Sequence, residues 1–206
     1  MSRFPFFKEV SGVKVLVVGG GSVALRRAKA LAQSGADVMC VAPDFCDGFK
    51  ALHCRVRGFQ ESDLEDAAIV IAATDDHALN GRIAALCRRK GIEVNCTDNP
   101  QASTFSFPAI IRRGGMTAAV SSDGVSPSAS KYIRERIESA IPEDFEEILS
   151  KMETARIRVK ELEADSEKRS AVLRRIFDAL VSGEEMNEEQ IRQFMADQTI
   201  DKRMGM

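Results

Sequence analysis

The chain has few of the residues that build metal or disulfide sites. Its 206 residues include only two histidines and five cysteines, and no two cysteines stand in a CxxC spacing. Structural zinc sites need clustered thiolates or imidazoles, so the sequence predicts no metal site. The odd number of cysteines favours reduced thiols, some of them core residues, in a cytoplasmic protein.

Long apolar runs and an excess of one charge are also missing. No stretch approaches the roughly 20 apolar residues of a membrane span, and the first residues lack the apolar core of a signal peptide. Lysine and arginine number 29 against 31 acidic residues, a net charge of −2, which gives no general electrostatic reason to bind nucleic acid. We therefore expect one or two globular domains, with neither a membrane nor a nucleic acid as partner.

Glycine and proline are scarce only in the last third of the chain. Residues 1–140 hold 12 of the 14 glycines and 5 of the 6 prolines. Residues 141–206 carry 16 acidic and 11 basic residues, a net charge of −5, which leaves +3 for the first 140 residues. This split predicts a mixed α/β region followed by helices.

Short apolar segments alternate with helical patterns in the first part. Residues 14–18 and 38–42 are typical of buried strands, and a glycine turn and a helix separate them. Two more strands, at 67–73 and 92–95, flank a helix at 78–90. The alternation predicts a doubly wound parallel sheet, whose ligands bind beyond the carboxyl ends of the strands.

The second part begins with a predicted hairpin. Residues 103–111 and 116–121 are typical of two strands around a glycine-containing turn. Four helices are predicted after it: one that begins at Ser126 and Pro127, one after Pro142, one that contains Val172, Ile176 and Leu180, and a last one capped by Asn187 and Gln190.

The glycine turn has the spacing G-x-G-x-x-A at Gly19, Gly21 and Ala24. It follows a predicted strand and opens a predicted helix, which is the context of a dinucleotide-binding turn. Asp44 lies 23 residues after Gly21, where an acid would bond the ribose hydroxyls of the cofactor, and no Lys or Arg follows it directly. The pattern favours NAD over NADP. The alternatives are a purely structural glycine turn and a Pro-Asp turn at Asp44.

Three predicted strand ends carry an aspartate, namely Asp44, Asp75 and Asp98. Aspartate is common in turns, which is the alternative explanation for any one of them. In a parallel sheet, however, all three would lie on the rim where ligands bind.

A series of motifs in this order resembles precorrin-2 dehydrogenase, the dehydrogenase and ferrochelatase module of siroheme synthase. The resemblance covers roughly residues 1–140 and is weaker in the helical tail. The motifs are Arg3-Phe-Pro-Phe-Phe7, Val17-Val-Gly-Gly-Gly-Ser-Val-Ala24, Ala42-Pro43, Ala72-Ala-Thr-Asp-Asp76, Asn80, Val94-Asn95, Asp98, Phe107-Pro108 and Val120-Ser-Ser-Asp-Gly-Val-Ser-Pro127.

The resemblance implies a homodimeric enzyme that oxidises precorrin-2 to sirohydrochlorin with NAD. Some members of the family also insert Fe²⁺, as a substrate, to give siroheme, and the sequence leaves that second activity open. The implied parts are a Rossmann domain at residues 1–111, a dimerisation segment at 112–143 and a helical domain at 144–206. Because the sequence ends at Met206, we expect a separate protein to perform the preceding methylation.

The resemblance places the catalytic aspartate at Asp98, where a carboxylate could accept the proton that the oxidation releases. The implied substrate carries many carboxylates, so basic side chains should help to hold it, whereas His53 and His77 have no predicted ligand role. The predicted NAD contacts are Gly19, Gly20, Gly21, Ser22, Val23, Pro43, Asp44, Thr74 and Asp75, and the predicted substrate contacts are Ser122, Arg112, Arg113, Lys131 and Arg134.

Two alternatives remain open from the sequence. One is a non-catalytic NAD-sensing Rossmann module, which would share the glycine turn but would not require Asp98 or the Ser121–Pro127 segment. The other is an NAD-dependent reductase of a different small substrate. For any single predicted substrate contact, ordinary surface charge is a competing explanation.

Overall fold

A computed structural model describes residues 4–184, 189–190 and 192–194 of the chain. The chain divides into two compact units, Met1–Phe107 and Pro108–Met206. The finer division into a dimerisation segment at 112–143 and a helical domain at 144–206 stays a prediction.

The first unit is built on a five-stranded parallel sheet. The strand order β3-β2-β1-β4-β5 reverses direction at β1, the arrangement of a doubly wound sheet, so the predicted fold class is confirmed. The strands are β1 (Lys14–Val18), β2 (Asp37–Ala42), β3 (His53–Val56), β4 (Ile69–Ala72) and β5 (Glu93–Cys96).

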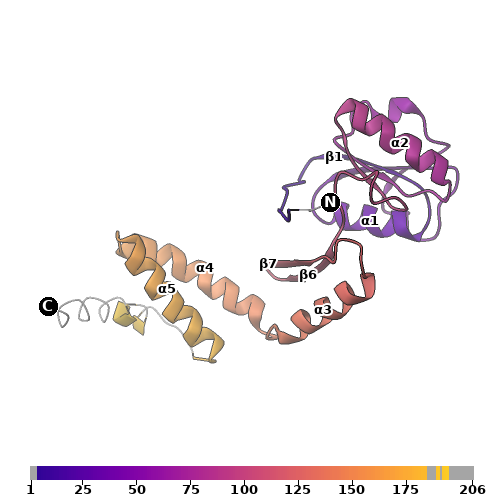
Figure 1. Ribbon diagram of the computed structural model, residues 1–206. Helices are drawn as coiled ribbons and strands as arrows, with labels where there is room; N and C mark the ends of the chain where they lie inside the picture. Colours follow the sequence, from indigo (N-terminus) through magenta and orange to yellow (C-terminus); the bar gives the residue numbers. More distant parts are fainter. Residues whose placement is uncertain (1–3, 185–188, 191, 195–206) are drawn as a thin grey trace. The chain divides into compact units, whose positions relative to one another are not determined.

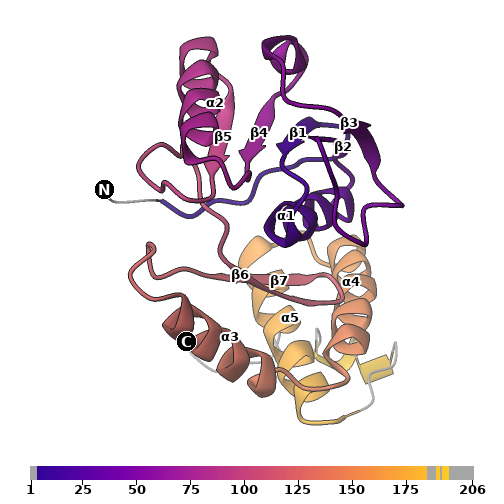
Figure 2. The ribbon, with the colours of Figure 1, turned by 90° about the vertical axis from the view of Figure 1, so that its right-hand side faces the viewer.

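Two helices cover opposite faces of this sheet, as Figures 1 and 2 show. Successive strand residues point to opposite faces, so Val15 and Val17 pack with α1 (Ser22–Ala32), while Leu16 and Val18 pack with α2 (His77–Lys90). Burial on both faces explains why the central strands are continuous apolar runs.

The sequence did not predict β3 or the short 3₁₀ helix η1 (Glu61–Leu64). All four side chains of β3 are exposed, so the strand carries no alternating apolar pattern. Its backbone pairing with β2 holds it at the edge of the sheet instead. Arg57 supports the link to η1 through an ion pair with the buried Asp63 carboxylate, at 2.5 Å.

The predicted strand at 103–111 is wrong in its first half, because β6 begins only at Ala109. Residues 103–105 run beside β5 and bond to it largely through side chains. Ser103 Oγ accepts from the Cys96 amide, Thr104 Oγ1 accepts from the Val94 amide, and the Asn95 side chain donates to the Phe105 carbonyl. Hydroxyl and amide groups here replace the regular backbone ladder of a strand.

The second unit begins with the predicted hairpin, an antiparallel pair of β6 (Ala109–Arg113) and β7 (Met116–Val120). Helix α3 (Pro127–Ala140) follows and packs against both strands. As predicted, Ser126 caps it, with Oγ accepting from the Ala129 amide at 3.1 Å, and Pro127 is its first residue.

Helices α4 (Phe145–Leu162) and α5 (Ser166–Val181) lie side by side (Figure 1). A separate apolar core joins them, centred on Val159 and Ile176, which are fully buried. Asn187, Ile191 and Met195 of the last predicted helix lie outside the described residues. Within the described part of the chain, every helix falls short of the length and apolarity that a bilayer crossing requires.

Candidate functional site

The predicted cofactor residues and Asp98 all follow strands of the parallel sheet at its carboxyl edge. The glycine turn follows β1, Pro43 and Asp44 follow β2, Thr74 and Asp75 follow β4, and Asp98 follows β5. Because the strands are parallel, these loops share one rim of the first unit, which is where doubly wound sheets bind ligands.

The three glycines of the turn are needed for two different reasons. A Cβ at Gly19 would lie 2.3 Å from the Ala73 carbonyl oxygen, and one at Gly20 would lie 1.8 Å from that of Asp44. A Cβ at Gly21 would meet nothing within 4 Å. Gly19 and Gly20 therefore allow backbones to pack, whereas Gly21 leaves open the space that a cofactor pyrophosphate would occupy.

The amino terminus of α1 faces this open space. Gly21 is its N-cap and supplies no capping side chain, and the first turn contains no acidic residue. Backbone N–H groups at a helix start attract anions, and Ser22 and Val23, both exposed, lie in this first turn. The residues fit a dinucleotide bound through its phosphates.

The loop after β2 is tied to the glycine turn. The Cys46 amide donates to the Gly20 carbonyl at 2.8 Å, and both Pro43 and Asp44 are exposed. An exposed carboxylate beside the glycine turn fits the predicted bond from Asp44 to an adenosine ribose, which stays a prediction.

A buried asparagine joins the loop after β4 to Asp98. Asn80, on α2, is fully buried. Its Oδ1 accepts from the Thr74 amide at 3.1 Å and from Thr74 Oγ1 at 2.7 Å, while its Nδ2 donates to the Thr74 carbonyl at 2.9 Å and to Asp98 Oδ2 at 3.1 Å. The Thr74 hydroxyl is therefore engaged inside the protein, and the asparagine fixes one oxygen of Asp98.

Two more side chains contact the Asp98 carboxylate. Cys96 Sγ donates to Oδ1 at 3.0 Å, and His77 Nδ1 hydrogen-bonds to Oδ2. Burial alone would raise the pKa of Asp98, but the hydrogen bonds from Cys96, His77 and Asn80 outweigh it and lower the pKa to about 2. Burial and the bond to Asp98 raise the pKa of the Cys96 thiol to about 11, and the Asp98 carboxylate raises the pKa of His77.

Sequence reasoning assigned no role to His77, Asn80 or Cys96. A signal for Asn80 was present, because it is a polar residue on the buried face of a predicted helix. His77 directly follows the aspartates after β4, so its position on the rim could be predicted from the sequence. Its contact with Asp98 could not, because that contact depends on the pairing of β4 with β5.

The predicted substrate contacts all lie in the second unit. The Ser122 hydroxyl donates to the Ser126 carbonyl at 2.9 Å and accepts from the Ser126 amide at 3.1 Å and from Ser130 Oγ at 2.9 Å. A serine hydroxyl has one proton and two lone pairs, so these bonds use its full capacity. Here Ser122 supports the start of α3, and its contact with substrate stays a prediction.

The predicted basic residues differ in their surroundings. On α3, Arg134 pairs with Glu138 at 2.6 Å, and Lys131 lies 3.9 Å from Glu135. Arg112 and Arg113 are neighbours on β6, so their side chains leave the hairpin on opposite faces, and Arg113 is the less exposed of the two. The two arginines therefore do not share one face.

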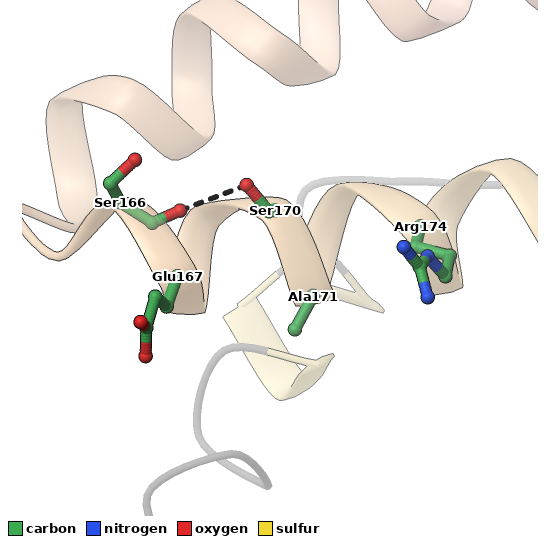
Figure 3. A pocket seen from close by; sticks show the side chains of 5 residues that line it. All are labelled: Ser166, Glu167, Ser170, Ala171 and Arg174. Atoms are coloured by element: carbon green, nitrogen blue, oxygen red, sulfur yellow. Dashed lines mark hydrogen bonds between the residues drawn. The ribbon is translucent and has the colours of Figure 1, made fainter.

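A hollow of about 340 Å³ lies on α5, lined by Ser166, Glu167, Ser170, Ala171 and Arg174. Figure 3 shows these side chains along one stretch of the helix, where Ser170 Oγ donates to the Ser166 carbonyl at 2.9 Å. None of the predicted site residues lines it.

Comparison with known proteins gives concordant matches. Residues 6–109 match a family model described as "Putative NAD(P)-binding". A siroheme synthase of Ectopseudomonas mendocina (strain ymp) is 38% identical over 187 residues, which cover 88% of this chain and 40% of that protein. A siroheme synthase of Pseudomonas entomophila (strain L48) is 36% identical over 209 residues, 96% of this chain and 45% of that protein.

The chain thus spans less than half the length of these curated relatives. A solved structure, "SirC, precorrin-2 dehydrogenase", superposes with a TM-score of 0.70 at 26% sequence identity. That match covers 97% of this chain and 100% of the other.

Proposed function

Because this chain belongs to the NAD(P)-binding family that its residues 6–109 match, we propose that it is a dehydrogenase that uses NAD to oxidise precorrin-2 to sirohydrochlorin in siroheme biosynthesis. The observation that carries the proposal is the Asp98 carboxylate, held by Asn80 on the same sheet edge as the open glycine turn. Likeness to a precorrin-2 dehydrogenase over nearly all of both chains supports this oxidation over the NAD-dependent reduction of a different small substrate.

NAD fits the first unit better than NADP does. The space at Gly21 and the start of α1 suit the pyrophosphate, and Asp44 suits the free ribose hydroxyls. A carboxylate at this place repels a 2′-phosphate, and the residues after Asp44 are Phe45 and Cys46 rather than a cation. When bound, NAD⁺ supplies the acceptor for a hydride from the substrate.

The protein's own part in the chemistry is positioning and proton transfer. Asp98 follows β5 at the rim, and its side chain is 19% exposed, so it stays accessible while three donors hold it. We place Asp98 in the acid–base apparatus that receives the proton of the oxidation.

The second copy in a homodimer would cover the hairpin and α3. No residue of α3 is buried, and Tyr132, Ile133 and Ile137 on it are exposed. Helix α3 packs against both strands of the two-stranded β6–β7 sheet and still leaves these apolar side chains exposed. A partner copy would cover them.

The same rim is also where we would place insertion of Fe²⁺ into sirohydrochlorin, and the assay below tests this second activity.

The five unpaired thiols agree with the cytoplasmic location that the composition predicts.

The decisive experiment supplies freshly made precorrin-2 and NAD⁺ to the purified protein and follows NADH and sirohydrochlorin by absorbance. We expect both to form together, and with NAD⁺ faster than with NADP⁺. Absence of NADH with NAD⁺ and of NADPH with NADP⁺ would refute the dehydrogenase function. Adding Fe²⁺ after completion then tests for siroheme.

A further inference from the structure

An exposed histidine lies against the Asp98 carboxylate. His77 is the first residue of α2, directly after the N-cap Asp76. Its side chain is 83% exposed, whereas that of Asp98 is 19% exposed, and His77 Nδ1 hydrogen-bonds to Asp98 Oδ2. The histidine therefore projects from the rim beyond the carboxylate.

The hydrogen bonds around Asp98 determine the state of the ring. Cys96 and Asn80 donate to the carboxylate, which is ionised at neutral pH. An ionised carboxylate only accepts, so Nδ1 of His77 must carry the proton in this contact. In the neutral ring, Nε2 then holds the free lone pair, and no residue in the described part of the chain hydrogen-bonds to it.

The same contacts make Asp98 a poor base by itself. Each carboxylate oxygen already accepts a hydrogen bond, and a carboxyl group that titrates near pH 2 has little affinity for a proton at neutral pH. An imidazole titrates near neutrality, and a carboxylate on its other nitrogen increases its basicity. The exposed ring is the better acceptor.

We propose that His77 and Asp98 work as a dyad, in which Nε2 of His77 accepts the proton that the oxidation releases and Asp98 orients the ring. This inference rests on the proposed dehydrogenase function. The substrate loses two electrons and two hydrogens as a new double bond forms within it. One hydrogen leaves as a hydride, which reduces NAD⁺ to NADH, and the other leaves as a proton, for which Nε2 forms the new N–H bond. The imidazolium then returns that proton to water.

The dyad predicts the direction of the pH dependence. The charged and titratable groups at the ring are Asp98 on the β5 loop, Asp76 before α2 and the Cys96 thiol bonded to Asp98. The first two raise the pKa of His77 above its ordinary 6.5. Because the neutral ring is the active form, kcat/KM should rise with pH through a midpoint above 6.5 and then level off.

The activity test compares His77→Gln with His53→Gln, since these are the only two histidines in the chain. We expect His77→Gln to lower kcat by about a hundredfold or more, with NAD affinity unchanged. The rise of kcat/KM with pH should be absent from this variant. His53, exposed on β3, should be replaceable without effect. Added imidazole should restore part of the activity of His77→Ala. Activity of His77→Gln within about threefold of the unchanged protein would overturn the dyad.

A second measurement needs no substrate. In the untagged His53→Gln protein, the remaining imidazole gives one set of nuclear magnetic resonance signals, whose titration reports His77 alone. We expect a pKa above 6.5 that falls when Asp98→Asn is added. An unshifted titration would refute the dyad itself, whereas absence of NADH from the unchanged protein would refute the proposed function and leave the His77–Asp98 contact intact.

Discussion

Asn80 Nδ2 donates a hydrogen bond of 3.1 Å to Asp98 Oδ2, although the two residues stand 18 positions apart in the sequence. The amide of Asn80 is otherwise committed to Thr74, so that both of its donors and both lone pairs of its oxygen are used. The loop after β4 thereby sets the position of a side chain that belongs to the loop after β5.

Replacement of Asp98 by asparagine should abolish turnover without loss of NAD affinity. An amide at this place can donate to Nδ1 of His77 and hold the ring in the opposite tautomer, so we expect kcat to fall by about 10³ to 10⁴. Steady-state rates and a fluorescence titration with NADH measure the two quantities. The matched control is Asp66→Asn, an exposed carboxylate whose only described ion pair is to Lys14, and full activity of Asp98→Asn would contradict the assignment.

The same pair should make stability depend on pH. The pKa of Asp98 is lowered from 3.8 to about 2, so its stabilisation is complete above pH 3.8 and is lost as the pH falls toward 2. The pKa of His77 is raised, so its contribution is complete below pH 6.5 and is lost as the pH rises through the raised value. Urea unfolding of the unchanged protein and of Asp98→Asn should therefore differ most between about pH 4 and 6.5. A difference that stays constant from pH 3 to 8 would argue against the pair.

Alanine at Gly20 should lower stability, whereas alanine at Gly21 should lower NAD affinity. The Gly20 position places a Cβ 1.8 Å from the Asp44 carbonyl oxygen, so Gly20→Ala should lower the free energy of unfolding by about 1–3 kcal/mol. The Gly21 position is open, so Gly21→Ala should fold normally but weaken NAD binding by about tenfold or more, because the methyl group fills the pyrophosphate space. Thermal melts and NAD titrations of both variants measure the two effects. An unchanged NAD affinity in Gly21→Ala would show that the turn does not bind the dinucleotide.

A charge on α3 should separate the proposed dimer. Ile133, which is 45% exposed, would lie in the interface, so Ile133→Glu should shift the sedimentation coefficient from dimer to monomer. Ile157→Glu on α4 makes the same chemical change at a more open position, 60% exposed, and should leave the dimer intact. A dimer that survives Ile133→Glu would show that the interface does not include this part of α3.

The two hairpin arginines should not contribute equally to substrate binding. Their side chains leave β6 on opposite faces, so only one of Arg112→Gln and Arg113→Gln should raise the KM for precorrin-2, by about tenfold. Equal increases in both variants would show that the hairpin does not present one face to the substrate.

The sequence was sufficient for much of the fold because the central strands are buried on both faces. Apolar runs such as Lys14–Val18 predicted the parallel sheet, and the glycine turn after it predicted the edge at which a ligand would bind. The capping serine before Pro127 likewise marked the start of α3. The predicted elements were confirmed where the sequence has a continuous apolar run or a clear helix-capping residue.

The sequence was insufficient where contacts between distant segments decide the outcome. Strand β3 exists through its pairing with β2, and residues 103–105 are held by side chains rather than by a backbone ladder. His77 read as a surface residue, because only the register of β4 against β5 brings it to Asp98. The substrate contacts in the second unit remain predictions for the same reason.

The two edges of the parallel sheet have consequences for how this protein behaves at high concentration. At one edge, the Ser103 and Thr104 hydroxyls occupy amides of β5 that another strand could otherwise pair with. At the other edge, β3 is exposed, but Arg55 within it and Arg57 just after it are cations paired with Asp63. Charged edge strands resist edge-to-edge pairing with other molecules. The first unit is thereby protected against aggregation through its sheet.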